Sequence, residues 1–177
     1  MTIVTQTKAS LRPMTIAEHW NTLVPEYRSV TYPLLVMRVE WNPEYAELIE
    51  KISLTRAHNR FRNYVDHEEL TRASFKLQSK GEASIRFGVS KSGHGYNGER
   101  GDFCLASGVI RGKNLTLFYR SLELIGGFAY DLTLIRGIQN KYFNFNTVTF
   151  IATKANVFAL KGNSNEKLFP KLQRIFG

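Results

Sequence analysis

Groups able to act as a nucleophile and as an anion-binding pair occur close together in the sequence. Cys104 is the only cysteine of the chain, and Arg120, Ser121 and Asp131 follow it. A thiolate is a nucleophile, and a neighbouring cation lowers the pKa of a thiol. An arginine beside a serine can hold a phosphate through hydrogen bonds from the guanidinium and the hydroxyl group. The residue types therefore predict a nucleophile next to a phosphate-binding pair.

The stretch 104–119 is predicted to form a β-hairpin that brings these groups together. Two runs of strand-forming residues flank a polar, glycine-containing turn. If the loop has two residues and begins at Gly112, strand pairing places Cys104 opposite Ser121 and beside Arg120. The thiol would then lie next to a guanidinium and a hydroxyl group.

The same residues also have purely structural interpretations. A free cysteine within a strand is often a small buried core residue, which is the alternative for Cys104. Surface arginines such as Arg86 commonly make loose ion pairs. Asp131 could be an acid in the first turn of a helix, where it would be favoured by the helix dipole.

The segment 120–131 resembles the signature of the thymidylate synthase and deoxycytidylate hydroxymethylase family. Arg120-Ser121-Leu122-Glu123 stands where that family has R-S-x-D, and Gly127 and Tyr130-Asp131 stand where it has a glycine and an aromatic residue followed by Asn or Asp. The family's cysteine lies further upstream of the arginine than Cys104 does. Shortening both hairpin strands by an equal, even number of residues leaves the cysteine facing the same partner.

Weaker similarity extends the resemblance over roughly residues 84–160, together with clear departures. The family's Pro-Cys-His core around the nucleophile is absent, because Phe103 and Leu105 flank the cysteine here. Phe158 and Leu160 replace the family's sugar-binding His and Tyr. The family segments that help to close the folate site have no counterpart, so the resemblance favours the nucleotide pocket over the folate site.

The resemblance implies transfer of a one-carbon group to carbon 5 of a pyrimidine nucleotide. Cys104 would add to carbon 6 of the ring. Arg120, Ser121 and Arg86 would hold the 5′-phosphate, with Arg86 reaching across a homodimer interface. In the family, Asn at the position of Asp131 accompanies uracil and Asp accompanies cytosine. A carboxyl group that shares a proton with a ring nitrogen suits the edge of cytosine, so hydroxymethylation of a cytosine nucleotide is expected.

Two glutamates complete the implied site. Glu47, in a predicted helix, resembles the family's catalytic glutamate and would relay protons through water, although Glu50 or Glu40 could serve instead. Glu123 stands where the family has an aspartate that contacts the pterin ring, so methylenetetrahydrofolate is the implied cofactor. No metal is expected, because the four histidines show no spacing typical of zinc ligands.

Composition indicates a basic globular protein. The chain of 177 residues has a formal net charge of +9 and 43% hydrophobic residues, without an apolar run long enough to span a bilayer. We expect a loose arm at 1–13 and one domain at 14–177. The single cysteine and the lack of a recognisable signal peptide favour the cytoplasm. The basic charge could attract a nucleotide, a nucleic acid or an anionic surface, or could simply be solubilising.

Periodicity and turn residues predict helices interspersed with strands, which is typical of an α+β fold with a mixed or antiparallel sheet. The hairpin apart, we expect helices at 15–24, 43–55 with Asn42 as N-cap, 128–139 and 165–176, and strands at 29–39, 74–77, 84–90 and within 148–160. The charged stretch 56–69 is expected to be a helix end followed by a loop, and 91–100 a loop.

Three functions therefore remain open. The first is a nucleotide-modifying enzyme of the kind implied above. The second is a non-catalytic protein of the same fold that binds a nucleotide or nucleic acid through its basic surface. The third retains the nucleophile but acts on a base within a polymer.

Overall fold

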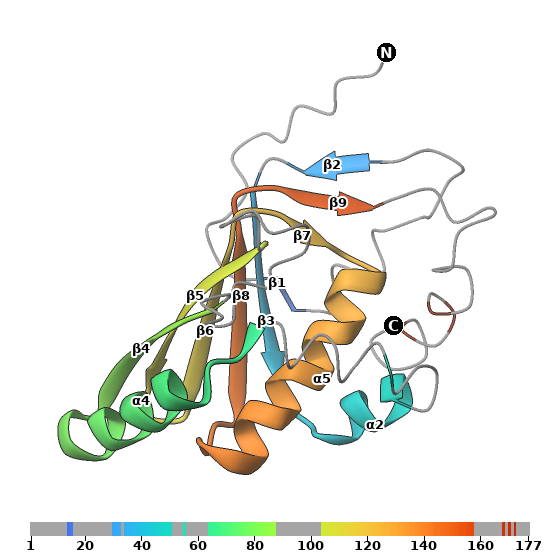
Figure 1. The fold of residues 1–177 in the computed structure, drawn as a ribbon. Helices are drawn as coiled ribbons and strands as arrows, with labels where there is room; N and C mark the ends of the chain where they lie inside the picture. Colours follow the sequence, from blue (N-terminus) through green and yellow to red (C-terminus); the bar gives the residue numbers. More distant parts are fainter. Residues whose placement is uncertain are drawn as a thin grey trace.

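The computed structural model describes residues 14–15, 30–32, 34–50, 55, 64–87, 104–157, 168, 170 and 172 (Figure 1). The described helices are α2 (Glu44–Glu50), α4 (His67–Lys80) and α5 (Gly126–Lys141). The described strands are β1 (Met14–Thr15), β2 (Val30–Tyr32), β3 (Leu35–Glu40), β4 (Glu82–Arg86), β5 (Leu105–Arg111), β6 (Asn114–Tyr119), β7 (Leu122–Glu123), β8 (Thr147–Ala152) and β9 (Ala155–Val157).

These strands form two sheets within the described part of the chain. The large sheet has the order β1-β3-β8-β6-β5-β4, and the small sheet has the order β2-β9-β7. In the large sheet β1 is parallel to β3 and β6 is parallel to β8, whereas the other neighbours are antiparallel. The prediction of an α+β fold with a mixed sheet is therefore confirmed. The small sheet and the first turn of α5 lie at the same end of the large sheet (Figure 1).

Helix α5 packs on one face of the large sheet and forms the centre of the core. Phe128 of α5 contacts Phe150 of β8 edge to face, with ring centroids 5.2 Å apart. Leu132 and Ile135 continue the same helical stripe, and all of these side chains have no exposed surface. The predicted helix 128–139 is confirmed, and the structure extends it at both ends.

Helix α4 replaces a strand and a loop that the sequence predicted. Asp66 accepts hydrogen bonds from the backbone N–H groups of Glu68 (2.9 Å) and Glu69 (3.2 Å), so the charged run at 66–69 begins a helix. The helix ends at Gly81, whose φ of 74° lies in the left-handed region. The predicted strand at 74–77 is wrong because burial follows a helical spacing, with Leu70 and Ala73 on the covered side.

The predicted strand at 29–39 is two strands that belong to different sheets. β2 pairs with β9 in the small sheet, and β3 pairs with β1 and β8 in the large sheet. Pro33 follows β2 in the sequence, and proline has no N–H group to continue a ladder of hydrogen bonds. After β3, the Asn42 side chain accepts a hydrogen bond from the N–H group of Glu44 (3.0 Å), which confirms the predicted N-cap of α2.

Other predictions are confirmed in part or lie outside the described residues. The range 148–160 contains β8 and β9, and the range 84–90 overlaps the end of β4. Thr15 belongs to β1, and the rest of the predicted helix 15–24 is outside the described residues. The arm 1–13, the loop 91–100 and most of the helix 165–176 also lie outside them. None of the helices within the described ranges is both long and apolar enough to cross a membrane.

The cap at Asp66 predicts a measurable effect on stability. Asp66→Ala removes the acceptor for two backbone N–H groups and should lower the free energy of unfolding by about 1 kcal/mol. The melting temperature should fall by roughly 2–4 °C. Asp66→Asn retains a side-chain oxygen and is the matched control, with a smaller loss expected. Equal melting of the wild type and Asp66→Ala would contradict the cap.

Candidate functional site

The β5–β6 hairpin brings Cys104 and Arg120 together, although in a register that differs from the predicted one. From the turn as far as Ser107 and Phe118, the pairing is as predicted. A β-bulge then lies between Leu105 and Ser107, so Leu105 pairs with Tyr119. The N–H group of Arg120 donates to the carbonyl oxygen of Cys104 at 2.8 Å.

Cys104 is therefore opposite Arg120, and its predicted place opposite Ser121 is wrong by one residue. The extra residue that the bulge adds to β5 is the physical reason. The half-buried Cys104 packs against the hydrophobic core, and Arg120 is exposed.

The segment that carries Arg120 and Ser121 is held by the turn between β8 and β9 and by β9 itself. The Thr153 hydroxyl donates to the carbonyl oxygen of Arg120 at 2.6 Å, and the Asn156 amide donates to the Ser121 hydroxyl oxygen at 2.8 Å. The Ser121 hydroxyl group can still donate its own hydrogen to an anion. Thr153 and Asn156 were missed by the sequence reasoning, and polar residues within the strand-forming run 148–160 were the available signal.

Glu123 caps the first turn of α5. Its carboxylate accepts hydrogen bonds from the backbone N–H groups of Ile125 (3.0 Å) and Gly127 (2.6 Å). A Cβ atom at Gly127 would lie 3.2 Å from the Cβ atom of Glu123, so the glycine permits this close approach. The sequence resemblance suggested a contact with a cofactor, and the structure adds a helix-capping contact that it did not predict.

Burial raises the pKa of the Glu123 carboxyl above its ordinary value of 4.5. The hydrogen bonds from backbone N–H groups oppose this effect, and the nearby carboxyl group of Asp131 reinforces it. Asp131 is fully buried in the second turn of α5. The alternative of a first-turn acid is therefore wrong, and the two carboxyl groups form an acidic pair near the start of the helix.

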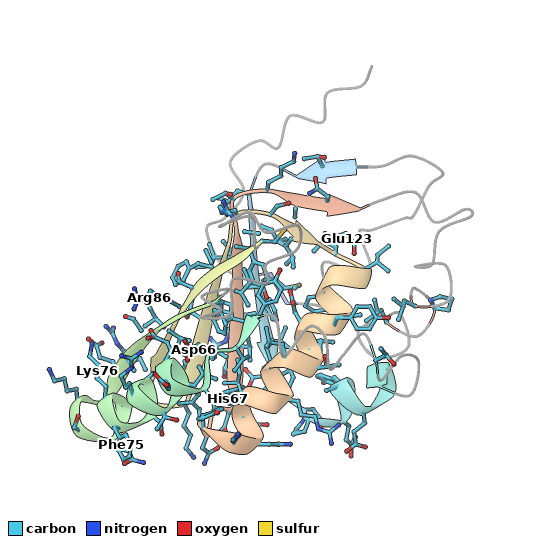
Figure 2. All side chains as sticks on the ribbon, viewed as in Figure 1. Asp66, His67, Phe75, Lys76, Arg86 and Glu123 are labelled. Carbon is cyan, nitrogen blue, oxygen red and sulfur yellow. The ribbon has the colours of Figure 1, made fainter. Side chains whose placement is uncertain are left out.

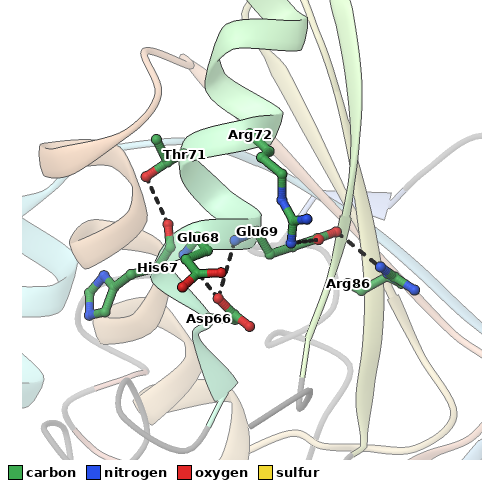
Figure 3. Close-up of polar contacts among 7 residues, drawn as sticks. All are labelled: Asp66, His67, Glu68, Glu69, Thr71, Arg72 and Arg86. Carbon is green, nitrogen blue, oxygen red and sulfur yellow. Dashed lines mark hydrogen bonds and ion pairs between the residues drawn. The ribbon is translucent and has the colours of Figure 1, made fainter. Parts of the chain in front are cut away.

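Arg86 and Glu47 lie apart from the corner that holds Cys104, Arg120 and Ser121. Arg86 ends β4 opposite Ser107, at the end of the sheet that carries Cys104. Its guanidinium Nε lies 3.5 Å from a carboxylate oxygen of Glu69, as Figure 3 shows. Glu47 lies 3.5 Å from Arg136 of α5, roughly 15 Å along the helix from its first residue.

The alternatives to Glu47 are no closer. Glu40 ends β3 opposite Thr147, at the other end of the sheet from Cys104, and the side chain of Glu50 lies outside the described residues. The structure thus gathers Cys104, Arg120 and Ser121 at one corner, with Glu123 and Asp131 following on α5. Within the described ranges, no group of three or more His, Cys, Asp or Glu side chains could hold a metal ion.

Comparison of the chain with models of known protein families and with curated protein sequences finds no match.

The raised pKa of Glu123 predicts a pH dependence of stability. Between pH 4.5 and the raised pKa, the folded state binds more protons than the unfolded state, so the free energy of unfolding falls as the pH rises. The contribution of the Glu123 carboxyl group to stability is present in full below pH 4.5 and is lost as the pH rises through the raised pKa.

Glu123→Gln should remove this pH dependence, while the lost hydrogen bond to Gly127 lowers stability by a constant amount at every pH. Urea unfolding of both proteins from about pH 4 upward measures the difference. If the free energy of unfolding changed with pH in the same way in both proteins, the assignment of the pH dependence to Glu123 would be contradicted.

Proposed function

We propose that the chain transfers a one-carbon group to carbon 5 of a cytosine nucleotide, with Cys104 as the nucleophile. The product expected first is a hydroxymethylated deoxycytidylate, made in the cytoplasm by a homodimer with a fold like that of thymidylate synthase. The supporting observation is the pairing of Cys104 with Arg120, followed in the chain by Ser121 and by the acidic pair at the start of α5.

A nucleophile is needed to make carbon 5 of the pyrimidine ring reactive. Carbon 5 of a pyrimidine is a poor nucleophile until a group adds to carbon 6. The Cys104 thiolate forms a bond to carbon 6, and the electron pair of the C5–C6 double bond moves to carbon 5, which then attacks the one-carbon unit. Loss of the proton on carbon 5, with the folate carrier as the leaving group, would leave an exocyclic methylene group on the ring. Water would then add its oxygen to the methylene carbon and release a proton, and departure of the thiolate would restore the C5–C6 double bond and the free cysteine.

Arg120 and Ser121 would bind the 5′-phosphate. The guanidinium is a planar donor with several N–H groups, and the serine hydroxyl adds a further donor. Lys154 is exposed, and its carbonyl oxygen accepts from the N–H group of Leu122 at 2.8 Å, which supports a cationic corner. Asp131 would contact the base, and because it is fully buried, base binding requires local opening at the start of α5.

Glu47 remains the proposed proton relay. Its contact with Arg136 would orient the carboxylate, and no contact between described residues joins it to Cys104. Protons would therefore pass through water between Glu47 and the base.

The carboxylate of Glu123 fits a folate cofactor. A carboxylate has about four acceptor positions, so an N–H group of a pterin ring could bind beside the backbone N–H groups of Ile125 and Gly127. Bound beside Glu123, methylenetetrahydrofolate would supply the one-carbon unit. Glu123 would then bind the cofactor and also orient α5, and with it Asp131, through the same carboxylate.

A homodimer is supported by the face of the large sheet opposite α5. The register aligns Val36, Ile151, Phe118, Ser107 and Arg86 in one row across β3, β8, β6, β5 and β4. Each of these side chains retains exposed surface within the described part of the chain. Packing this row against a second copy would bury apolar side chains and carry Arg86 towards the partner's nucleotide.

The nucleophile is tested by trapping. Incubation with a 5-fluoropyrimidine nucleotide and the folate should leave a covalent adduct on Cys104, because carbon 5 then has no proton to lose. Mass spectrometry of peptides locates the adduct, and Cys104→Ser should abolish it while the circular dichroism spectrum is unchanged. Nucleotide binding without an adduct, or an adduct on another residue, would overturn the proposed catalysis.

Base choice tests the role of Asp131. A carboxylate can accept from the ring N–H group of uracil but has no hydrogen to donate to the ring carbonyl oxygen, which stays unsatisfied, whereas a proton shared with the ring nitrogen of cytosine leaves both groups paired. The wild type should therefore bind deoxycytidylate about ten- to a hundredfold more tightly than deoxyuridylate. Asp131→Asn should narrow or reverse this ratio, as measured by calorimetry. Equal affinity of the folded wild type for both nucleotides would contradict the assignment.

A further inference from the structure

Helix α4 has an exposed basic face, made of Arg72, Phe75, Lys76 and Lys80. The three cations are spaced by four residues, which places them about 6 Å apart along the helix axis. Positions 70–80 contain no acid. Phe75 lies next to Arg72 on the helix surface and is 67% exposed. Figure 2 shows Phe75 on the lower side of α4, away from the sheet.

Packing among the described residues does not explain the α4 basic face. The helix buries Leu70 and Ala73, whereas the four residues of the α4 basic face are exposed. Arg72 pairs with Glu69 at 3.3 Å, whereas Lys76 and Lys80 make no ion pair with any described residue. Like charges four residues apart repel each other, and an exposed phenyl ring is unfavourable in water. A ligand that binds the cations and covers the ring would account for both features.

The chemistry of the α4 basic face favours single-stranded nucleic acid. A row of cations matches the repeating negative charge of a phosphate backbone, and an exposed aromatic ring offers a surface on which a base can stack. Bases in a duplex are already stacked on one another, so this ring favours an unpaired strand. A helix that binds membranes presents a wide apolar face, whereas Phe75 is the only large apolar residue exposed on described α4.

We propose that the α4 basic face binds single-stranded RNA or DNA, with phosphates on Arg72, Lys76 and Lys80 and a base stacked on Phe75. An open hollow of about 390 Å³, lined by His67, Glu68, Thr71 and Arg72, adjoins the first turn of the helix. It gives space for a neighbouring nucleotide, and Figure 3 shows the four side chains that line it. The inference goes beyond the nucleotide-modifying activity, because none of the four residues of the α4 basic face belongs to the nucleotide site.

Fluorescence anisotropy with labelled oligothymidylate and oligouridylate, about 20 nucleotides long, tests the proposal. We expect binding of at least one of them that weakens with salt, and weaker binding of a duplex of equal length. Three phosphate contacts predict that the logarithm of the association constant falls with the logarithm of salt concentration with a slope of about −2. Comparison of the two oligonucleotides determines the preferred sugar.

Matched substitutions separate the α4 basic face from general charge. Lys76→Gln should make the salt slope shallower by about 0.7. Arg38→Gln removes one exposed cation of β3 and should leave the slope unchanged. Phe75→Ala should weaken binding roughly five- to 150-fold. Leu34→Ala removes another exposed apolar side chain and should have no effect.

Several results would overturn the proposal. These are equal changes of slope in Lys76→Gln and Arg38→Gln, unchanged affinity in Phe75→Ala, and binding to vesicles of anionic lipid without binding to either oligonucleotide. Cys104→Ser should bind oligonucleotides like the wild type. Loss of nucleotide modification with intact binding of oligonucleotides would overturn only the proposed enzyme activity. The reverse result would overturn only the proposed role of the α4 basic face.

Discussion

The packing of α5 against one face of the large sheet is the interaction on which the rest of the structure depends. Phe128, Leu132 and Ile135 have no exposed surface, and burial of side chains of this size stabilises a fold by roughly 1.5–3 kcal/mol each. β7 leads directly into α5, so the position of the helix also determines where Glu123 and Asp131 lie. The acidic pair is thus a consequence of core packing.

A second constraint acts at the corner between the two sheets. The β-bulge changes the partner of Cys104 to Arg120, and hydrogen bonds from Thr153 and Asn156 hold the segment that leaves β6. Backbone contacts therefore position Cys104 and Arg120 independently of any ligand. A corner with its geometry already determined loses less entropy when it binds an anion.

Helix α4 combines a structural side with an exposed basic side. Leu70 and Ala73 face the protein beside the edge strand β4, whereas Lys76 and Lys80 extend away from it. Arg72 and Arg86 share the carboxylate of Glu69, which links the helix to the end of the sheet that carries Cys104. Single-stranded nucleic acid bound along α4 would therefore end close to the proposed nucleotide site.

The sequence by itself determined the elements whose signals are local. The hairpin turn at Gly112, the N-cap at Asn42 and the apolar stripe of α5 depend on residues a few positions apart, so each was predicted. Local signals for two further features were missed, because Asp66 and Gly81 cap the helix at 67–80 and Glu123 accepts from N–H groups two and four residues along the chain. Only the tertiary structure decided that Cys104 faces Arg120 and that Glu47 lies against Arg136. These two outcomes depend on a bulge and on contacts between segments distant in the chain, and local propensity contains no information about either.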